Sequence, residues 1–162
     1  MRSKLFLIFA LALMLAVMAT AQTKTSGTVS CAKPEPAYSI EVGDRPGHSI
    51  SISKSACTWT TPMDIAGLQT KAGYDVTYGD ASGAKVRGSG YHVSNMSNGD
   101  KIYVRFQGND TPNTTEGTWS YTGGTGKLKG IKGKGTYKGK ADASGNMIVA
   151  VDGDYELPAA KK

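Results

Sequence analysis

Apolar and polar residues alternate in short runs along most of the chain, and Gly, Asn, Asp and Pro interrupt these runs. In one run Ile102, Val104 and Phe106 alternate with polar residues directly after Asn98-Gly99, a strong hairpin signal. A period of two is typical of β-strands, whereas an amphipathic helix repeats every 3.6 residues. The runs predict strands near residues 38–42, 49–59, 74–78, 86–94, 102–106, 117–121, 132–140 and 147–157.

One segment has the signals of a helix start. Thr61-Pro62-Met63-Asp64 combines a threonine cap, a proline at the first helical position and an acidic residue in the first turn. Gly67 and Gly73 would end any helix there within about two turns. We therefore expect either a short helix or an ordered loop.

The apolar residues after position 21 support an all-β fold. They include eight Val and seven Ile but only three Leu, and all eight tyrosines lie there. We predict one domain over residues 37–158, between a loose lead-in (22–36) and a short tail (159–162). Antiparallel strands in series predict an eight-stranded barrel, with a β-sandwich as the alternative. Barrel closure would remove exposed strand edges.

The first residues have the pattern of a secretory signal. Arg2 and Lys4 precede an apolar run from Leu5 to Val17, and Ala19-Thr20-Ala21 offers a cleavage site. We predict a signal peptide over residues 1–21 and a mature chain in the periplasm or outside the cell. We expect no membrane span in the mature chain.

The two cysteines predict a disulfide. Cys31 and Cys57 form an even pair in a chain expected to be exported. His48 and His92 stand alone, so no metal site is predicted. Neither histidine accompanies a catalytic motif, so we expect both to be ordinary polar residues. Asn95, Asn109 and Asn113 begin glycosylation sequons, which have meaning only in a eukaryotic secretory pathway.

A basic stripe occupies the C-terminal third of a chain whose formal net charge is +6. On the strand near residues 132–140, four lysines share one face: Lys132, Lys134, Lys138 and Lys140. A hairpin about Ser144 would place Lys134 near Asp154 and Lys132 near Glu156 on the outer face. The stripe is then a solvated, paired face, or alternatively a surface for an anionic polymer. We expect no nucleic acid partner, because arginines and stacking aromatic residues are scarce there.

The opposite face of the same strand is glycine-rich. Gly133, Gly135 and Gly139 flank Tyr137 there. These glycines either permit barrel curvature or leave a cavity, which would lie beside three aromatic residues: Trp119, Tyr137 and Tyr155. A barrel of about eight strands can hold one small ligand.

The segment Gly123-Gly124-Thr125-Gly126-Lys127, continued by Gly130, Gly133 and Gly135, resembles the GGTGxFxxaxG segment of plant dirigent proteins. Similar segments occur in allene oxide cyclases and in small exported bacterial proteins. The resemblance implies an eight-stranded calycin-like barrel with a central cavity, often assembled as a trimer. Dirigent proteins guide radical coupling, and the cyclases act on a fatty-acid epoxide. Leu128 stands where dirigent proteins usually have an aromatic residue, and no catalytic residue carries over.

Three hypotheses about function follow. The first is non-catalytic binding of a small apolar molecule by Trp119, Tyr137 and Tyr155. The second is a cofactor-free isomerase or cyclase in the same cavity, which a buried carboxylate with a raised pKa would favour. The third is an envelope protein that binds an anionic polymer through the lysine face. No cofactor is expected under any of them, and the ligand and oligomeric state stay open.

Overall fold

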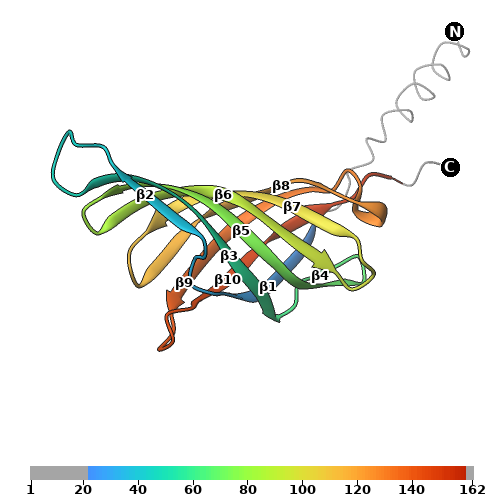
Figure 1. Cartoon of the computed structure of the whole chain (residues 1–162). Helices are drawn as coiled ribbons and strands as arrows, with labels where there is room; N and C mark the ends of the chain where they lie inside the picture. The colour runs from blue at the N-terminus through green and yellow to red at the C-terminus, as the bar shows by residue number, and fades with distance from the viewer. Residues whose placement is uncertain (1–21, 160–162) are drawn as a thin grey trace, which may run out of the picture.

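A computed structural model describes residues 22–159 (Figure 1). The predicted signal peptide and the end of the predicted tail lie outside these residues. The elements are, in chain order, β1 (Thr23–Cys31), β2 (Ala37–Glu41), β3 (His48–Thr61), β4 (Asp64–Ile65), β5 (Leu68–Ser82), β6 (Lys85–Met96), β7 (Lys101–Asp110), β8 (Thr114–Gly124), the 3-10 helix η1 (Gly126–Leu128), β9 (Lys132–Ala141) and β10 (Met147–Glu156).

Eight of these strands form a closed antiparallel barrel, as predicted. The order around it is β1, β10, β9, β8, β7, β6, β5 and β3, and β3 returns to β1. Strand β3 is long enough to close the ring because its first part pairs with β5 and its last part pairs with both β5 and β1. The sandwich alternative is therefore wrong.

Strand β2 lies outside the ring. It pairs with Ser49–Ser53 of β3, on the side that β1 occupies farther along β3. Its other edge has no strand partner among the described residues. All five residues of β2 are exposed.

Two expectations about the first half of the chain need correction. The stretch 22–36 is not a loose lead-in, because Thr23–Cys31 form β1 and pair with β10 along their whole length. Threonine and serine occupy most positions of β1, so its sequence shows no clear alternation of apolar and polar residues. Of the two alternatives expected after Thr61, the short helix does not form: β4 and β5 make an ordered hairpin there, in which Ala66 and Gly67 both have positive φ.

Apolar side chains gather in two places inside the barrel. The main core has seven buried residues: Val29, Cys31, Cys57, Trp59, Met63, Val104 and Trp119. The second group, which we call the end plug, closes one end of the barrel and contains Ile65, Leu68, Met96, Ile102, Leu128, Ile131 and Tyr155. The plug residues lie at the strand ends beside the β4–β5 and β6–β7 turns, in the β8–β9 connection and near the end of β10.

On one side of the barrel, polar side chains point into the interior and apolar side chains point outward, which is the reverse of a conventional core. Tyr74, Val76 and Tyr78 of β5 are exposed, whereas Asp75 and Thr77 line the interior. Strand β3 behaves in the same way before Cys57, with serines inside and isoleucines outside. One wall of the interior is therefore polar, and the outer surface behind it is apolar.

In residues 22–159, we find no helix of the length and hydrophobicity needed to span a bilayer.

Candidate ligand cavity

The barrel encloses a cavity of about 410 Å³. Its lining residues come from every strand of the ring. One end is closed by the end plug. At the other end the lining includes Lys33, Pro34, Pro112 and Gly145, which lie in the β1–β2, β7–β8 and β9–β10 connections. The cavity is therefore a cup with one mouth.

Aromatic rings form much of its apolar wall. Phe106 and Tyr137 pack edge to face with their ring centres 6.1 Å apart, and Trp119 and Tyr121 do so at 5.0 Å. Trp59 faces His92 in the same manner at 6.0 Å. Edge-to-face pairs hold each ring in one orientation, so the faces presented to the cavity are fixed.

Inward glycines make room for these rings. A Cβ atom on Gly153 would overlap the Trp119 ring, and one on Gly117 would lie 2.6 Å from the Tyr137 hydroxyl. The indole nitrogen of Trp119 donates to the main-chain oxygens of Thr136 and Asp152, both at 3.2 Å. The glycines thus let large aromatic side chains lie flat against neighbouring strands.

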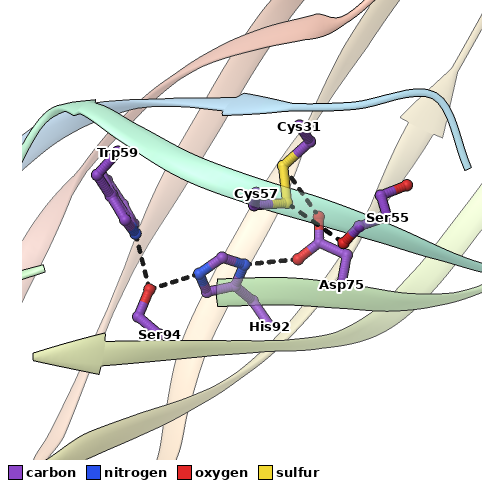
Figure 2. Close-up of a disulfide and its surroundings, with 7 residues drawn as sticks. All are labelled: Cys31, Ser55, Cys57, Trp59, Asp75, His92 and Ser94. Atoms are coloured by element: carbon purple, nitrogen blue, oxygen red, sulfur yellow. Dashed lines mark hydrogen bonds and ion pairs between the residues drawn. A yellow bond between two sulfur atoms is a disulfide. The ribbon is translucent and has the colours of Figure 1, made fainter. Parts of the chain in front are cut away.

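The polar wall carries a hydrogen-bonded chain of four side chains (Figure 2). The Trp59 indole donates to Ser94 Oγ at 2.7 Å, and Ser94 Oγ lies 2.7 Å from His92 Nε2. His92 Nδ1 lies 2.6 Å from Asp75 Oδ1. The strand register explains the meeting, since Asp75 pairs with His92 across β5 and β6. Both imidazole nitrogens are occupied by these contacts.

The direction of the protons in this chain follows from its first member. Because Trp59 can only donate, Ser94 Oγ accepts from it and can direct its own hydrogen to His92 Nε2. His92 then carries its proton on Nδ1 and donates it to Asp75. This arrangement satisfies every group with a neutral imidazole and a charged Asp75 carboxylate.

The predicted disulfide is present and lies beside this carboxylate (Figure 2). Cys31 and Cys57 face each other in the register of β1 and β3 and are joined at an S–S distance of 2.07 Å. Asp75 Oδ2 lies 3.6 Å from Cys31 Sγ. Cys31, Cys57 and Asp75 are also close enough for one metal ion. With the disulfide closed, however, the sulfurs are not thiolate ligands.

A second carboxylate lines the cavity near its mouth. Asp110 ends β7, and one of its oxygens accepts a short hydrogen bond from Thr115. Burial raises the pKa of Asp110, and the Thr115 hydrogen bond opposes the shift only in part. Burial, together with the negative charges of Asp110 and Asp75, raises the pKa of Tyr137 to about 12. Tyr137 is thus a neutral hydroxyl close to two carboxylates.

The aromatic residues predicted to bind a ligand are not all in one place. Trp119 and Tyr137 line the cavity. Tyr155 is buried in the end plug, where its hydroxyl accepts a hydrogen bond from the Ala66 backbone N–H at 2.9 Å. The structure brings Trp119 and Tyr137 together and gives Tyr155 a different position.

The four lysines of β9 are exposed on the outer face. Lys134 lies opposite Asp154, and Lys132 opposite Glu156, in the register of β9 and β10. That part of the prediction is confirmed. Lys138 forms an ion pair with Glu116 of β8 at 3.4 Å, while Asp154 contacts Lys24 at 3.6 Å.

Two other places are less suited to a small ligand. His48 lies outside the cavity, where Nδ1 contacts Asp44 and Nε2 is 3.3 Å from Asp80. A wide hollow of about 1240 Å³ on the outer side of β1 and β7–β10 is bordered by charges of both signs, Lys24 and Asp154 among them. It faces solvent, and its lining has two aromatic residues, Phe106 and Trp119, whereas that of the cup has five.

Three residues of the cavity are not among those that the sequence predicted for the site: Asp75, Asp110 and Trp59. No linear motif marks them, because their neighbours in the site come from other strands. The signal that could have found Asp75 is its place between Tyr74 and Val76: an acid in an alternating strand faces either solvent or a polar interior. The apolar residues were the natural choice for the interior, and here they lie outside.

Comparison with known proteins places the fold. No family model and no curated protein matches the chain. A pterocarpan synthase dirigent protein has a similar structure, with a TM-score of 0.50 and 13% identity over 88% of each chain. The chain has the dirigent barrel fold.

Two further solved structures are similar. A second pterocarpan synthase dirigent protein gives a TM-score of 0.49 at 14% identity, over 86% of this chain and 97% of that one. A pyocyanin demethylase gives 0.45 at 16% identity, over 78% and 98%. At these identities the dirigent likeness extends to the fold, and the chemistry of the cavity has to be argued from this chain's own residues.

Proposed function

We propose that this protein binds a small, largely apolar molecule inside the barrel without transforming it. The supporting observation is the one-mouthed cavity of about 410 Å³ with an aromatic wall and a polar wall. Ligand sites typically measure about 300–1000 Å³ and combine apolar surface with a few fixed polar groups. The size suits a molecule of one to three fused or linked rings.

Binding would draw on burial of the ligand against Trp119 and Tyr137. Each Å² of apolar surface removed from water contributes about 25 cal/mol, before the cost of immobilising the ligand is subtracted. Asp75 and Asp110 would orient it through hydrogen bonds. Both lie on rigid strands, so little of this arrangement has to form during binding.

Native mass spectrometry of the protein exported by a bacterial host tests the proposal most directly. We expect extra mass under native conditions that is lost on denaturation. In parallel, a neutral fluorescent naphthylamine should bind with a stoichiometry of one. A protein that retains nothing and binds no apolar probe would contradict the proposal.

Two matched substitutions locate the binding. Thr77→Phe places a ring in the cavity, whereas Thr58→Phe places the same ring on the exposed outer face of β3. We expect Thr77→Phe to weaken probe binding at least tenfold and Thr58→Phe to leave it unchanged. Tyr155→Phe removes a hydroxyl from the end plug and should not affect the probe. Equal effects of both phenylalanines would place the ligand elsewhere.

A second candidate is a cofactor-free enzyme that uses the same cavity. The observation that favours it is Asp110, a cavity carboxylate whose pKa is raised by burial. Incubating an extracted ligand with a small fraction of fresh protein separates the two functions. Chromatography would show a new isomer or cyclised product for an enzyme, and an unchanged ligand for a binding protein.

We further propose that the chain is exported to the periplasm or the outside of the cell. The disulfide supports this location, because such bonds persist in oxidising compartments. The denatured mass of the exported protein should correspond to a chain that begins at Gln22 and lacks two hydrogens. A full-length mass with free thiols would contradict it.

A further inference from the structure

The charge inside the cavity narrows the class of ligand, if the proposed binding function holds. Among the described lining residues, the charged side chains are Asp75, Asp110 and Lys33. Lys33 lies in the β1–β2 connection at the mouth and is exposed. The half-buried charges of the lining are therefore two carboxylates, in a chain whose formal net charge is +6.

Neither carboxylate is neutralised by a lysine or arginine among the described residues. Asp75 has His92 as its basic partner, and the hydrogen-bond chain from Trp59 is satisfied with that imidazole neutral. Asp110 accepts one hydrogen bond from Thr115, and its other oxygen faces the inward side of Gly88 on β6. Each aspartate keeps an oxygen that a ligand could contact.

The aromatic wall also favours positive charge. The rings of Phe106, Trp119, Tyr121 and Tyr137 line the cavity from β7, β8 and β9. The face of an aromatic ring attracts a cation, and clusters of rings recognise quaternary ammonium groups. Aromatic rings from β7 to β9, Asp75 on β5 and Asp110 at the end of β7 therefore line one cavity and form a site for an organic cation.

We infer that the ligand of this barrel is an apolar cation: an amine, a quaternary ammonium compound or an aromatic ring system with delocalised positive charge. A neutral apolar molecule would strip water from Asp75 and Asp110 without replacing it, which is costly. An anion would be repelled by both. A cation satisfies the two carboxylates and packs against the rings.

Three naphthyl probes of nearly equal shape test this inference by calorimetry. One carries a trimethylammonium group, one the neutral tert-butyl group and one a sulfonate. We expect the ammonium probe to bind at least tenfold tighter than the tert-butyl probe, and the sulfonate to bind weakest. In Asp75→Asn/Asp110→Asn this preference should fall to near parity, and in Asp110→Asn alone it should shrink. Asp152→Asn, on the outer face, is the matched control.

The outcomes separate the two proposals. Equal or tighter binding of the tert-butyl probe overturns the cation inference and leaves the binding function standing. The same holds if the ammonium preference survives in the double variant while that variant keeps its thermal transition. If no probe binds up to about 1 mM, both proposals fail.

A separate observation concerns the outside of the barrel. The large apolar side chains that are exposed in the described structure all belong to one surface, which we call the apolar face: Tyr38, Ile40, Val42, Ile52, Tyr74, Val76, Tyr78 and Tyr91. They lie on β2, β3, β5 and β6 or directly after β2. Tyr38, Ile52 and Tyr78 form one row across three paired strands.

The apolar face is large enough for a stable contact. Its four tyrosines are 39–65% exposed, which together amounts to roughly 400 Å². The four aliphatic residues add to this area. A standard interface buries about 800 Å² per partner, and the largest apolar patch of a typical monomer measures about 300–600 Å².

Strand β2 adds unpaired backbone groups at the border of the apolar face. Val42 N–H donates to His48, and Lys54 N–H donates to Pro36. Backbone groups alternate in direction along an antiparallel strand, so those of Ala37, Ser39 and Glu41 point away from β3. They form a free edge that can pair with another strand.

The charges around the apolar face have both signs: Asp80 stands opposite Arg87, and Lys54 lies over the Tyr74 ring. A self-complementary contact accommodates such a mixture, whereas an anionic polymer or membrane would select one sign. We propose that a second copy of this chain docks here. Its β2 pairs antiparallel with the first β2 about a two-fold axis at Ser39, which places Tyr38 of each copy beside Ile40 of the other.

Light scattering after size exclusion tests this pairing. We expect a dimer for the wild type and a monomer for Ser39→Pro, because proline removes an edge-directed N–H without breaking the bonds to β3. Ser39→Ala is the control and should stay dimeric. Tyr38→Ser/Ile40→Ser should also weaken the dimer, because these side chains meet across the paired edges. A monomeric or trimeric wild type, or a Ser39→Pro dimer, overturns the proposal, as does binding of the monomer to lipid vesicles.

Discussion

Asp110 is a residue where the proposed site and the stability of the fold oppose each other. Burial raises its pKa, so the folded protein holds the Asp110 proton more tightly than the unfolded chain does. Its contribution to stability is greatest below its ordinary pKa of 3.8 and falls as pH rises through the raised value. Above that range the buried charge is a cost.

We therefore predict that Asp110→Asn raises the melting temperature at neutral pH. The difference from the wild type should disappear as the pH falls toward the ordinary pKa, where the wild-type carboxyl is also neutral. Thermal unfolding followed by circular dichroism over this range checks the sign. A loss of stability at neutral pH would show that the Thr115 hydrogen bond outweighs the burial of the charge.

Gly153 gives a second prediction for a single residue. Its absent side chain leaves the space that the Trp119 ring fills. We predict that Gly153→Ala costs about 1–3 kcal/mol of unfolding free energy, because a Cβ atom there forces the ring or β10 to move. Urea denaturation measures the cost, and near-ultraviolet circular dichroism reports the Trp119 environment. Ala150→Ser, exposed on the same strand, is the control and should change stability by less than about 0.5 kcal/mol.

At the level of elements, the sequence predicted strands and some pairings well. Lys134 and Asp154 pair as expected because one turn with strong signals fixes the register of a two-strand hairpin. Asn98-Gly99 likewise marks the β6–β7 turn, where Gly99 has a φ of 87°. Local signals suffice when the partner strands are adjacent in the chain.

Which face of a strand points into the barrel is harder to predict than the presence of the strand. Alternation states that Tyr74 and Val76 share a face, but not that this face is the outer one. On β5 the interior accepts Asp75 because His92 on β6 satisfies it. That compensation depends on the register of two strands and leaves no mark in either one alone. Prediction of the candidate site failed at this step.

The disulfide joins β1 and β3, the two strands whose pairing closes the barrel. Its two cysteines are 26 residues apart in the sequence. The bond lies beside the point along β3 where the pairing partner changes from β2 to β1. We predict that Cys31→Ser/Cys57→Ser lowers the unfolding free energy by about 3–4 kcal/mol, since the unfolded chain gains freedom. Denaturation with and without reductant measures this loss. The double variant should not respond to reductant; a wild type equally indifferent to it would contradict the prediction.

On the scale of the whole molecule, the barrel has two unlike halves. Strands β3, β5 and β6 turn polar groups inward and apolar ones outward, while β7 to β9 place aromatic rings inside and, apart from Asp110, charges outside. The closed ring makes both arrangements workable, because each cavity wall faces the other across the same space. Composition predicted an all-β fold and the series of strands predicted a barrel, but this division appears only when the strands are placed in order.

The charged half allows a last prediction, about the lysine face. Lys138 pairs with Glu116, and acids of β10 stand opposite Lys132 and Lys134. Exposed pairs of this kind stabilise the fold by only about 0–1 kcal/mol. Their acidic members nevertheless interrupt the positively charged surface, so that no large basic patch remains on the described part of the chain. We predict that the protein leaves a heparin column by about 0.15 M salt, where charges beyond about 8 Å are screened.

Two substitutions distinguish a paired face from a polymer-binding one. Asp152→Ser/Asp154→Ser removes acids between the lysines of β9 and Lys24 of β1, so it should delay elution to higher salt. Lys132→Ser/Lys134→Ser should advance elution only slightly, because the wild type gains little from them. Strong retention of the wild type that this lysine variant abolishes would instead show that the face binds anionic polymers, and β9 would then be a second functional surface on the barrel.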